Sequence, residues 1–301
     1  MKHFLSIESL SREEIVDLVN LAGTMKATRG RHEKHPLRHQ CWALLFSKSS
    51  TRTRVSFEVG IRELGGDVMF LSAHEIHLGR GEPIKDTARV MGRMLHGAVI
   101  RTFAQSDVEE FARYSGIPTI NALTDDEHPC QIIADLQTIQ ERLGRIDNFV
   151  MTFVGDGACN MPRSWLWAAA RLGFELRIAA PKPFQPEPEL LARLGNARVT
   201  VTEDLAAAAE GADVLYTDVW VSMGKEEEAA FRQAQLAHYQ INADLVKRAK
   251  PGALVMHCLP AYRGKEITDE TFEVNAQTIF DQAENRLHAQ KAILSVLAEG
   301  C

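Results

Sequence analysis

Short apolar runs and amphipathic stretches alternate along most of this chain. The first clear run is Cys41–Phe46, and in the stretch Ser50–Gly65 that follows it, Phe57, Ile61 and Leu64 recur at helical spacing. Apolar runs of this length are typical of buried strands, whereas apolar residues at positions i, i+4 and i+7 line one face of a helix. The pattern therefore predicts a strand that leads through a polar loop into a helix.

The same alternation predicts the other elements. In the first half of the chain we expect a helix at Ser6–Gly23 capped by Ser11, strands at Asp67–Leu71, Ala98–Phe103 and Pro118–Ala122, and helices at Ile84–Leu95, Val108–Ser115 and Pro129–Gly144. After Asp147–Asn148 the alternation restarts. Here we expect strands at Phe149–Val154, Leu176–Ala180, Arg198–Thr202, Val214–Asp218 and Ala253–His257, a loop at Pro181–Pro188, and helices at Pro162–Leu172, Glu226–Arg232, Ala243–Ala249 and from Thr278 onward.

Strands that alternate with helices form parallel sheets through right-handed crossovers. The sequence therefore predicts an α/β fold with two doubly wound parallel-sheet domains, residues 1–146 and 147–283, and a C-terminal helix at 284–301 that packs back on the first domain. Because ligands of such sheets bind beyond the carboxyl ends of the strands, we expect the active site in the cleft between the domains.

Composition excludes several classes of function. The 301 residues are 45% hydrophobic and 25% charged, which is ordinary for a globular protein. A net charge of −6 argues against a general nucleic-acid or membrane-surface binder, no apolar stretch approaches the ~20 residues of a membrane helix, and the N-terminus lacks a signal-peptide core. The five cysteines form no CxxC pair, so we expect free thiols in the cytoplasm rather than disulfides or a zinc site.

A phosphate site is predicted where the strand at Cys41–Phe46 leads into its helix. Ser49 to Arg54 hold four hydroxyl residues and two arginines within six positions. A helix N-terminus attracts anions through its free N–H groups and dipole, and arginine fits phosphate with two parallel hydrogen bonds. Alternatively, the serines form an ordinary helix cap, and Arg52 and Arg54 form a solvated face.

Three further polar clusters follow predicted strands. His128 and Gln131 in HPCQ would share one face of a helix, where a histidine can stabilise an oxyanion, although His128 could equally be a helix cap. Asp218 in DVWVSMG suits a substrate ammonium group, or begins a turn. Cys258 in HCLP is more typical of a buried thiol than of a nucleophile, because the adjacent His257 points the opposite way along an extended chain.

Other motifs are less informative. The run GDGACN lacks the third glycine of a dinucleotide fingerprint, and no acidic residue ends the next strand, so nucleotide binding is not favoured. Arg286 near the start of the last helix, and Lys85, could serve a ligand or a surface salt bridge.

Over nearly its whole length, the chain resembles the aspartate/ornithine carbamoyltransferase family. The motifs that carry the resemblance are, in order, STRTR with SFE, HPCQ, DVWVSMG, HCLPA and DQAENR. Two of them, DVWVSMG and HCLP, resemble the ornithine-type members of the family. The resemblance implies transfer of the carbamoyl group of carbamoyl phosphate to the δ-amine of L-ornithine, with no cofactor and no metal. It implies a first domain for carbamoyl phosphate and a second for ornithine. It also implies a cytoplasmic enzyme of arginine biosynthesis that forms a homotrimer or a multiple of trimers.

Residue roles follow from the same resemblance. The phosphate would be bound by Ser50, Thr51, Arg52 and Thr53, and by His77 of a neighbouring subunit; the carbamoyl group would be bound by Thr53, Arg101, His128, Gln131, Arg286 and the backbone carbonyl of Leu259. Ornithine would be bound by Asn160, Asp218, Ser222, Met223 and Cys258. Arg101, His128, Cys258 and Arg286 would be the catalytic residues.

One departure from the family pattern concerns the acceptor. Two adjacent asparagines and a later Asn or His are usual after GD, but here Cys159 replaces one asparagine and Arg163 occupies the later position. This leaves acetylornithine, succinylornithine and putrescine open as alternative acceptors. Aspartate is disfavoured, because the carboxylate of Asp218 suits an amine. A non-catalytic paralogue is a further alternative, although the full set of motifs argues against it.

Overall fold

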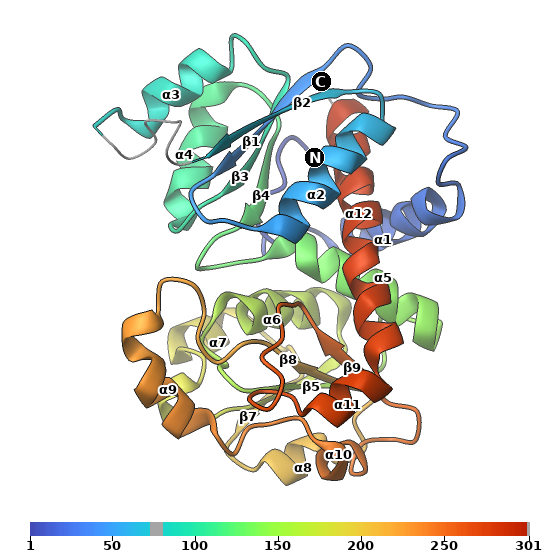
Figure 1. Cartoon of the computed structure of the whole chain (residues 1–301), viewed down its shortest axis with the longest axis vertical. Coiled ribbons are helices and arrows are strands. Elements are labelled where there is room, and N and C mark those ends of the chain that lie inside the picture. Colours follow the sequence, from blue (N-terminus) through green and yellow to red (C-terminus); the bar gives the residue numbers. More distant parts are fainter. Residues whose placement is uncertain (73–80, 300–301) are drawn as a thin grey trace. The chain divides into compact units, whose positions relative to one another are not determined.

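The computed structural model describes residues 1–72 and 81–299 (Figure 1). It divides into two compact units, one formed by Met1–Gln137 with Glu284–Cys301 and the other by Thr138–Ala283. The chain passes from one unit to the other within two helices, α5 (Pro129–Leu143) and α12 (Ala276–Glu299). No helix in the described part of the chain is long and apolar enough to cross a membrane.

The first unit contains a four-stranded parallel sheet with the order β2-β1-β3-β4. Its strands are β1 (Cys41–Phe46), β2 (Asp67–Ser72), β3 (Gly97–Arg101) and β4 (Thr119–Leu123), and its helices are α1 (Arg12–Ala27), α2 (Thr51–Glu63), α3 (Ile84–Met91) and α4 (Gln105–Ser115), with parts of α5 and α12. Because the strand order reverses at β1, right-handed crossovers place α2 on one face and α3 and α4 on the other, as Figure 1 shows.

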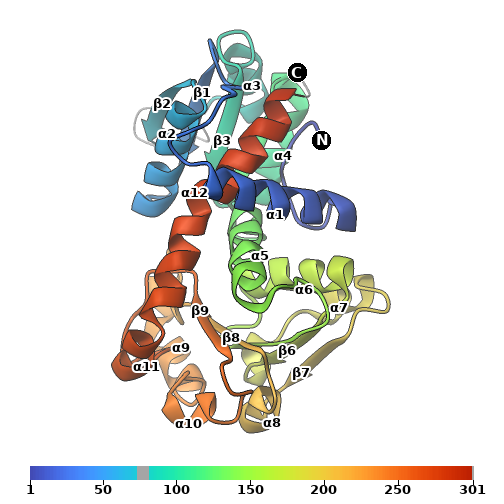
Figure 2. The ribbon, with the colours of Figure 1, turned by 90° about the vertical axis from the view of Figure 1, so that its right-hand side faces the viewer.

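The N-terminal helix differs from its predicted bounds. Helix α1 begins at Arg12 rather than Ser6, because Ser11 forms a capping box in which its hydroxyl accepts from Glu14 N–H and the Glu14 carboxylate accepts from Ser11 N–H. The helix crosses α12 (Figure 2), where Lys26 Nζ donates to Asn285 Oδ1 at 2.8 Å. Ser11 was therefore identified correctly as the cap, although the helix start was not.

The second unit contains a five-stranded parallel sheet with the order β7-β6-β5-β8-β9. Its strands are β5 (Val150–Val154), β6 (Glu175–Ala179), β7 (Val199–Thr202), β8 (Val214–Thr217) and β9 (Leu254–His257). Helices α6 (Asn160–Leu172) and α7 (Pro188–Arg193) lie over one face, and α8 (Leu205–Ala209) and α10 (Ala243–Val246) over the other (Figure 1). Every predicted strand of both sheets is present, within two residues of its expected bounds at either end.

Most of the short helices were not predicted, although α10, the shortest α-helix in the described part of the chain, falls within the expected helix at Ala243–Ala249. Helices α7, α8 and α11 (Asp269–Val274) and the 3-10 helix at Lys182–Phe184 have six residues or fewer, too few for a periodic apolar pattern. Side-chain caps mark two of them: Asp204 accepts from Ala207 N–H, and Thr268 accepts from Thr271 N–H. The expected helix at Glu226–Arg232 is instead a 3-10 turn, Glu226–Glu228, followed by α9 (Ala229–Leu236).

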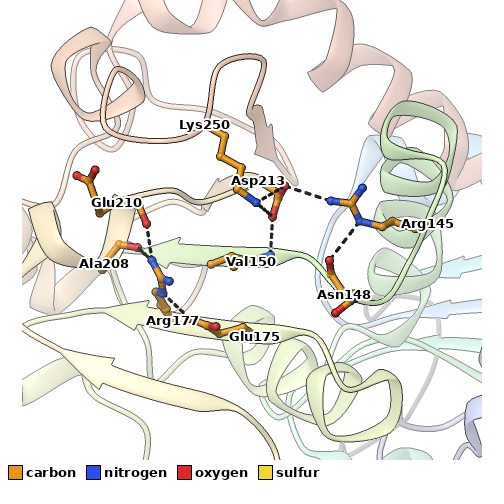
Figure 3. A network of polar contacts seen from close by, with 9 residues as sticks. All are labelled: Arg145, Asn148, Val150, Glu175, Arg177, Ala208, Glu210, Asp213 and Lys250. Carbon is orange, nitrogen blue, oxygen red and sulfur yellow. Dashed lines mark hydrogen bonds and ion pairs between the residues drawn. The ribbon is translucent and has the colours of Figure 1, made fainter.

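A buried carboxylate links residues at the end of the second sheet where its parallel strands begin (Figure 3). Asp213, whose side chain is 8% exposed, accepts from Val150 N–H at 2.8 Å, from Arg145 Nη2 at 3.2 Å and from Lys250 Nζ at 2.9 Å. Nearby, Arg177 donates to Glu175 at 2.7 Å. This network is structural, since it lies at the end of the sheet opposite to the carboxyl ends of its strands.

Candidate active site

In the first unit, the predicted phosphate ligands gather where the strand order reverses, between β1 and β3. Ser50 caps α2: its hydroxyl accepts from Thr53 N–H and donates to Thr53 Oγ1 at 3.0 Å. Thr53 is buried, whereas Thr51 and Arg52 are exposed in the first turn. The helix start thus presents N–H groups, hydroxyls and a guanidinium in one place, which suits an oxyanion.

Arg286 on α12 connects two of these predicted ligands. Its Nη1 donates to Gln131 Oε1 at 2.7 Å, and its Nη2 donates to Thr53 Oγ1 at 3.4 Å. Gln131 in turn donates to Asp135 Oδ1 at 2.8 Å. Three residues separated by up to 233 positions therefore form one hydrogen-bonded row, and Arg286 within it is only 5% exposed.

Arg101 and His128 complete the predicted carbamoyl group ligands. Arg101 is the last residue of β3, paired with Phe46 and with Leu123 after a bulge, and His128 directly precedes α5; both are buried. Burial, and the positive charges of Arg286 and Arg101, hold the pKa of His128 well below its ordinary value. His128 is therefore neutral near pH 7, and it can act as a hydrogen-bond donor to a developing oxyanion without gaining a charge.

In the second unit, the predicted ornithine ligands follow β5, β8 and β9. Asn160 is the first residue of α6, after β5, and Asp218 comes directly after β8. Asp218 Oδ1 accepts from Cys258 Sγ at 3.0 Å and from Val219 N–H at 2.7 Å. The structure thus brings Asp218 and Cys258 together, whereas Ser222 and Met223 lie four and five residues further along, partly and largely exposed.

Burial gives this carboxylate and a neighbouring thiol unusual acidities. Burial raises the pKa of Asp218. It also raises the pKa of Cys159 well above its ordinary value, with further contributions from the charges of Asp156 and Asp218. Cys159 is the N-cap residue of α6, and its Sγ donates to Asp156 O at 3.2 Å. A carboxylate that has lost hydration gains most from a cationic partner such as a substrate ammonium.

Cys258 is not paired with the histidine beside it. The ring of His257 contacts Glu266 Oε1 at 3.1 Å through Nε2 and accepts from Leu259 N–H at 2.8 Å through Nδ1. Among the described residues, Asp218, His257 and Cys258 form the one group whose potential metal-ligand atoms lie within 4.8 Å of one another. A metal there would have to displace one of the two contacts of His257.

The remaining predicted ligands are placed as follows. Leu259 has a positive φ of 60°, and Arg163 lies in the first turn of α6, partly exposed. His77 lies outside the described residues. Lys85 is exposed on α3.

Two buried basic side chains beside the predicted ligands were not expected from the sequence. Lys48, in the loop after β1, is buried, pairs with Asp125 and lies 4.2 Å from the centroid of the Phe103 ring. Arg232 on α9 is buried against Asp156, with Nη1 donating to Oδ2 at 2.7 Å. For Lys48, the position beside the serine-rich loop is a sequence signal that it lies near the predicted phosphate ligands. The pairing of Arg232 with Asp156 has no such signal, because it is set by tertiary contacts.

Known proteins match the chain along its full length. Residues 2–141 match the family model of the carbamoyl-P binding domain of aspartate/ornithine carbamoyltransferase, and residues 147–297 match the model of its Asp/Orn binding domain. The chain is 58% identical to an ornithine carbamoyltransferase of Akkermansia muciniphila, with 99% of each chain covered. It is also 51% identical to that of Syntrophotalea carbinolica, with 98% of this chain and 99% of the other covered.

Solved structures give the same result. An anabolic ornithine carbamoyltransferase from Campylobacter jejuni has a TM-score of 0.93 at 42% identity, with 100% of both chains covered. The ornithine carbamoyltransferase from Pyrococcus furiosus has a TM-score of 0.92 at 40% identity, with 100% of this chain and 98% of the other covered.

Proposed function

The chain belongs to the aspartate/ornithine carbamoyltransferase family, and on this premise we propose that it transfers the carbamoyl group of carbamoyl phosphate to the δ-amine of L-ornithine, giving L-citrulline and phosphate. Curated relatives and solved structures of this name, matched over the whole chain, support ornithine as the acceptor. The observation that carries the donor assignment is the row formed by Arg286, Gln131 and Thr53 at the start of α2.

The reaction needs a positioned electrophile and a neutral amine. The lone pair of the δ-nitrogen attacks the carbonyl carbon, a C–N bond forms, and negative charge grows on the carbonyl oxygen. The bond from this carbon to the phosphate oxygen then breaks, and phosphate leaves with the electron pair and takes the amine proton. No covalent enzyme intermediate is required, and holding the two reactants in orientation supplies much of the acceleration.

We assign the donor ligands within the first unit. Ser50, Thr51, Arg52 and the N–H groups at the start of α2 bind the phosphate group. Thr53, Arg101 and His128 hydrogen-bond the carbonyl oxygen as its charge grows, while Gln131 and Arg286 fix the carbamoyl group. Removing one such donor typically costs about 3 kcal/mol of transition-state stabilisation, so each should matter for turnover.

We assign the acceptor ligands within the second unit. Asp218 and Cys258 face the δ-amine, because a carboxylate with a raised pKa and a thiol hydrogen-bonded to it lie together there. Asn160, Ser222 and Met223 bind the amino-acid end of ornithine, and the Leu259 carbonyl accepts from the carbamoyl NH₂.

We further propose that the chain forms a homotrimer, or a multiple of trimers, in which His77 reaches the phosphate site of a neighbouring copy. An edge strand with apolar side chains facing outward supports an interface in the first unit. Strand β2 is at the edge of its sheet, Met69 on it is 46% exposed, and Val55 on α2 is 55% exposed. Such edges are usually covered, here by a second copy.

Cytoplasmic arginine biosynthesis is the setting that we propose for this activity. The four described cysteines are free thiols, which suits a reducing compartment. The structural relative from Campylobacter jejuni is named as an anabolic enzyme, and this favours the direction toward citrulline.

The activity is tested by measuring citrulline and phosphate produced from carbamoyl phosphate and L-ornithine. We expect equal amounts of the two products from the wild type, and at least about a 100-fold loss of kcat for Arg52→Ala, because the phosphate loses its guanidinium. Arg62→Ala is the matched control, since Arg62 is exposed in the last turn of the same helix. Equal kinetics for the two variants would refute the phosphate role of Arg52.

A further inference from the structure

We propose that His257 and Glu266 form a buried positioning pair that holds the Cys258–Leu259 turn in the conformation required for carbamoyl transfer. This inference rests on the proposed function, which assigns Cys258 to the ornithine amine and the Leu259 carbonyl to the carbamoyl NH₂. Neither His257 nor Glu266 contacts a substrate in that assignment, so both act through the turn between them.

The pair is fully enclosed. The side chains of His257 and Glu266 are both 0% exposed. His257 is the last residue of β9, and its N–H donates to Gln282 Oε1 at 3.0 Å. Glu266 Oε1 also accepts from Tyr262 N–H at 2.5 Å, so one carboxylate oxygen holds both the histidine ring and the loop that follows the turn.

The hydrogen bonds fix the state of the imidazole. Because the backbone N–H of Leu259 donates to Nδ1, that nitrogen must carry the lone pair. The proton therefore lies on Nε2, where it is donated to Glu266 Oε1. Rotation of the ring would break both contacts at once, so Glu266 determines which nitrogen faces Leu259.

The turn requires such a restraint. Leu259 has a φ of 60°, a left-handed conformation that glycine adopts readily but that L-residues other than asparagine and aspartate adopt rarely. Strained backbone of this kind persists where its surroundings hold it, and it is concentrated at functional sites. The hydrogen bond from Leu259 N–H to His257 directly restrains the backbone of Leu259. The same backbone conformation orients the carbonyl of Leu259.

The preceding residue depends on the same restraint. Cys258 lies between His257 and Leu259, and its Sγ donates to Asp218 Oδ1 at 3.0 Å. Loosening the turn would therefore disturb the Cys258–Asp218 contact together with the Leu259 carbonyl. The two groups act on different substrates in the proposed reaction, so the pair should affect the transfer step more than the binding of phosphate in the first unit.

The test compares three substitutions in the full-length chain. His257→Ala removes both ring contacts, whereas His257→Asn restores an acceptor near the position of Nδ1 but cannot reach Glu266. Asp213→Asn is the matched control, because Asp213 is a buried carboxylate of the same unit with backbone and side-chain partners at the opposite end of the sheet (Figure 3). The measurements are kcat/KM for ornithine, Kd for inorganic phosphate and Tm.

We expect His257→Ala to lower kcat/KM about 100-fold, as displacements near 1 Å do, while Kd for phosphate changes less than about twofold. His257→Asn should recover about tenfold of that loss. Asp213→Asn should keep kcat/KM within about threefold of the wild-type value, even if it lowers Tm by as much as His257→Ala does. A loss for His257→Ala no larger than for the control, or no recovery with His257→Asn, would overturn the proposal.

A second variant covers the case in which His257→Ala does not fold. Glu266→Gln keeps the size of the side chain and an acceptor oxygen but loses the charge, and it should lower kcat/KM about tenfold with Kd for phosphate unchanged. Wild-type kcat/KM in this variant would contradict the positioning role. Failure of the wild-type chain itself to make citrulline would instead refute the proposed function, so the two failures are distinguishable.

Discussion

Asp218 combines a functional assignment with a thermodynamic cost. Its carboxylate is taken partly out of water, which raises its pKa, and its partners are the Cys258 thiol and the Val219 N–H. An acid whose pKa is higher in the folded than in the unfolded state binds its proton more tightly when folded. Stability is therefore lost as the pH rises from the unfolded-state pKa through the folded-state pKa, and the full cost applies above it.

We therefore predict that Asp218→Asn stabilises the free protein while it impairs ornithine use. The increase in Tm over wild type should be small or absent at pH 4 and should reach about 2–4 °C at pH 7, as expected for ~1 kcal/mol in a chain of this size. In kinetics the same variant should raise KM for ornithine or abolish turnover. Thermal melts across this pH range check the first part, and a lower Tm than wild type at pH 7 would contradict it.

The sequence could predict which residues are candidate ligands, but it could not predict which side chains those residues contact. Motifs predict Thr53, Gln131 and Arg286 as ligands, yet the hydrogen bonds between these residues depend on helices far apart in the chain. The pairing of His257 with Glu266 rather than with Cys258 was equally inaccessible, although adjacency along the chain did argue against a Cys–His dyad. Lys48 and Lys291 are buried, contrary to the general expectation that lysines are exposed. Their burial can be seen only in the tertiary structure.

At the scale of elements, α2 and α12 are joined at two levels. Near the start of α2, Arg286 contacts Thr53; near its end, Lys291 Nζ lies 2.5 Å from Glu63 Oε2. The side chain of Lys291 is 0% exposed and that of Glu63 is 24% exposed. Glu63 also accepts from Arg29 Nε at 3.0 Å. The second contact fixes the register of the two helices that carry several of the proposed phosphate and carbamoyl group ligands.

The unequal burial predicts an unequal response to mutation. Glu63→Gln leaves a buried lysine without its carboxylate and should cost about 3 kcal/mol of unfolding free energy. Lys291→Met replaces that charge with an apolar side chain and leaves Glu63 paired with Arg29, so it should cost less than about 1 kcal/mol. Urea denaturation measures both, and a larger cost for Lys291→Met than for Glu63→Gln would show that the unpaired buried charge is not what destabilises the protein.

Elements with a long periodic pattern could be predicted, whereas most of the short helices of the second unit could not. The succession of strands and large helices along the chain followed from the spacing of apolar residues, whereas α8 and α11 are fixed by side-chain caps and by packing on the second sheet. The bounds of α1 were wrong because the apolar residues Ile7 and Leu10 are buried outside the helix, which extends the apolar pattern beyond the cap at Ser11.

At the scale of the whole molecule, the exposed apolar residues on α2 and β2 give a prediction about assembly. Mass measurement in solution should give three copies or a multiple of three. Met69→Glu should reduce that mass, because it places a charge on the exposed edge strand, whereas Val274→Glu should not, since Val274 is 79% exposed in the second unit. A wild-type mass of one copy would exclude the proposed intersubunit role of His77.

One assay decides which amine accepts the carbamoyl group. Carbamoyl phosphate is held at a fixed concentration, and kcat/KM for ureido-product formation is measured with L-ornithine, N-acetylornithine, N-succinylornithine, putrescine and L-aspartate. We predict that kcat/KM with L-ornithine exceeds every other value by at least about 100-fold, because each rival lacks or blocks a polar group that the site must pair. A higher value for any other acceptor would contradict the assignment of L-ornithine. It would also point to Cys159 and Arg163 as the residues that alter acceptor specificity.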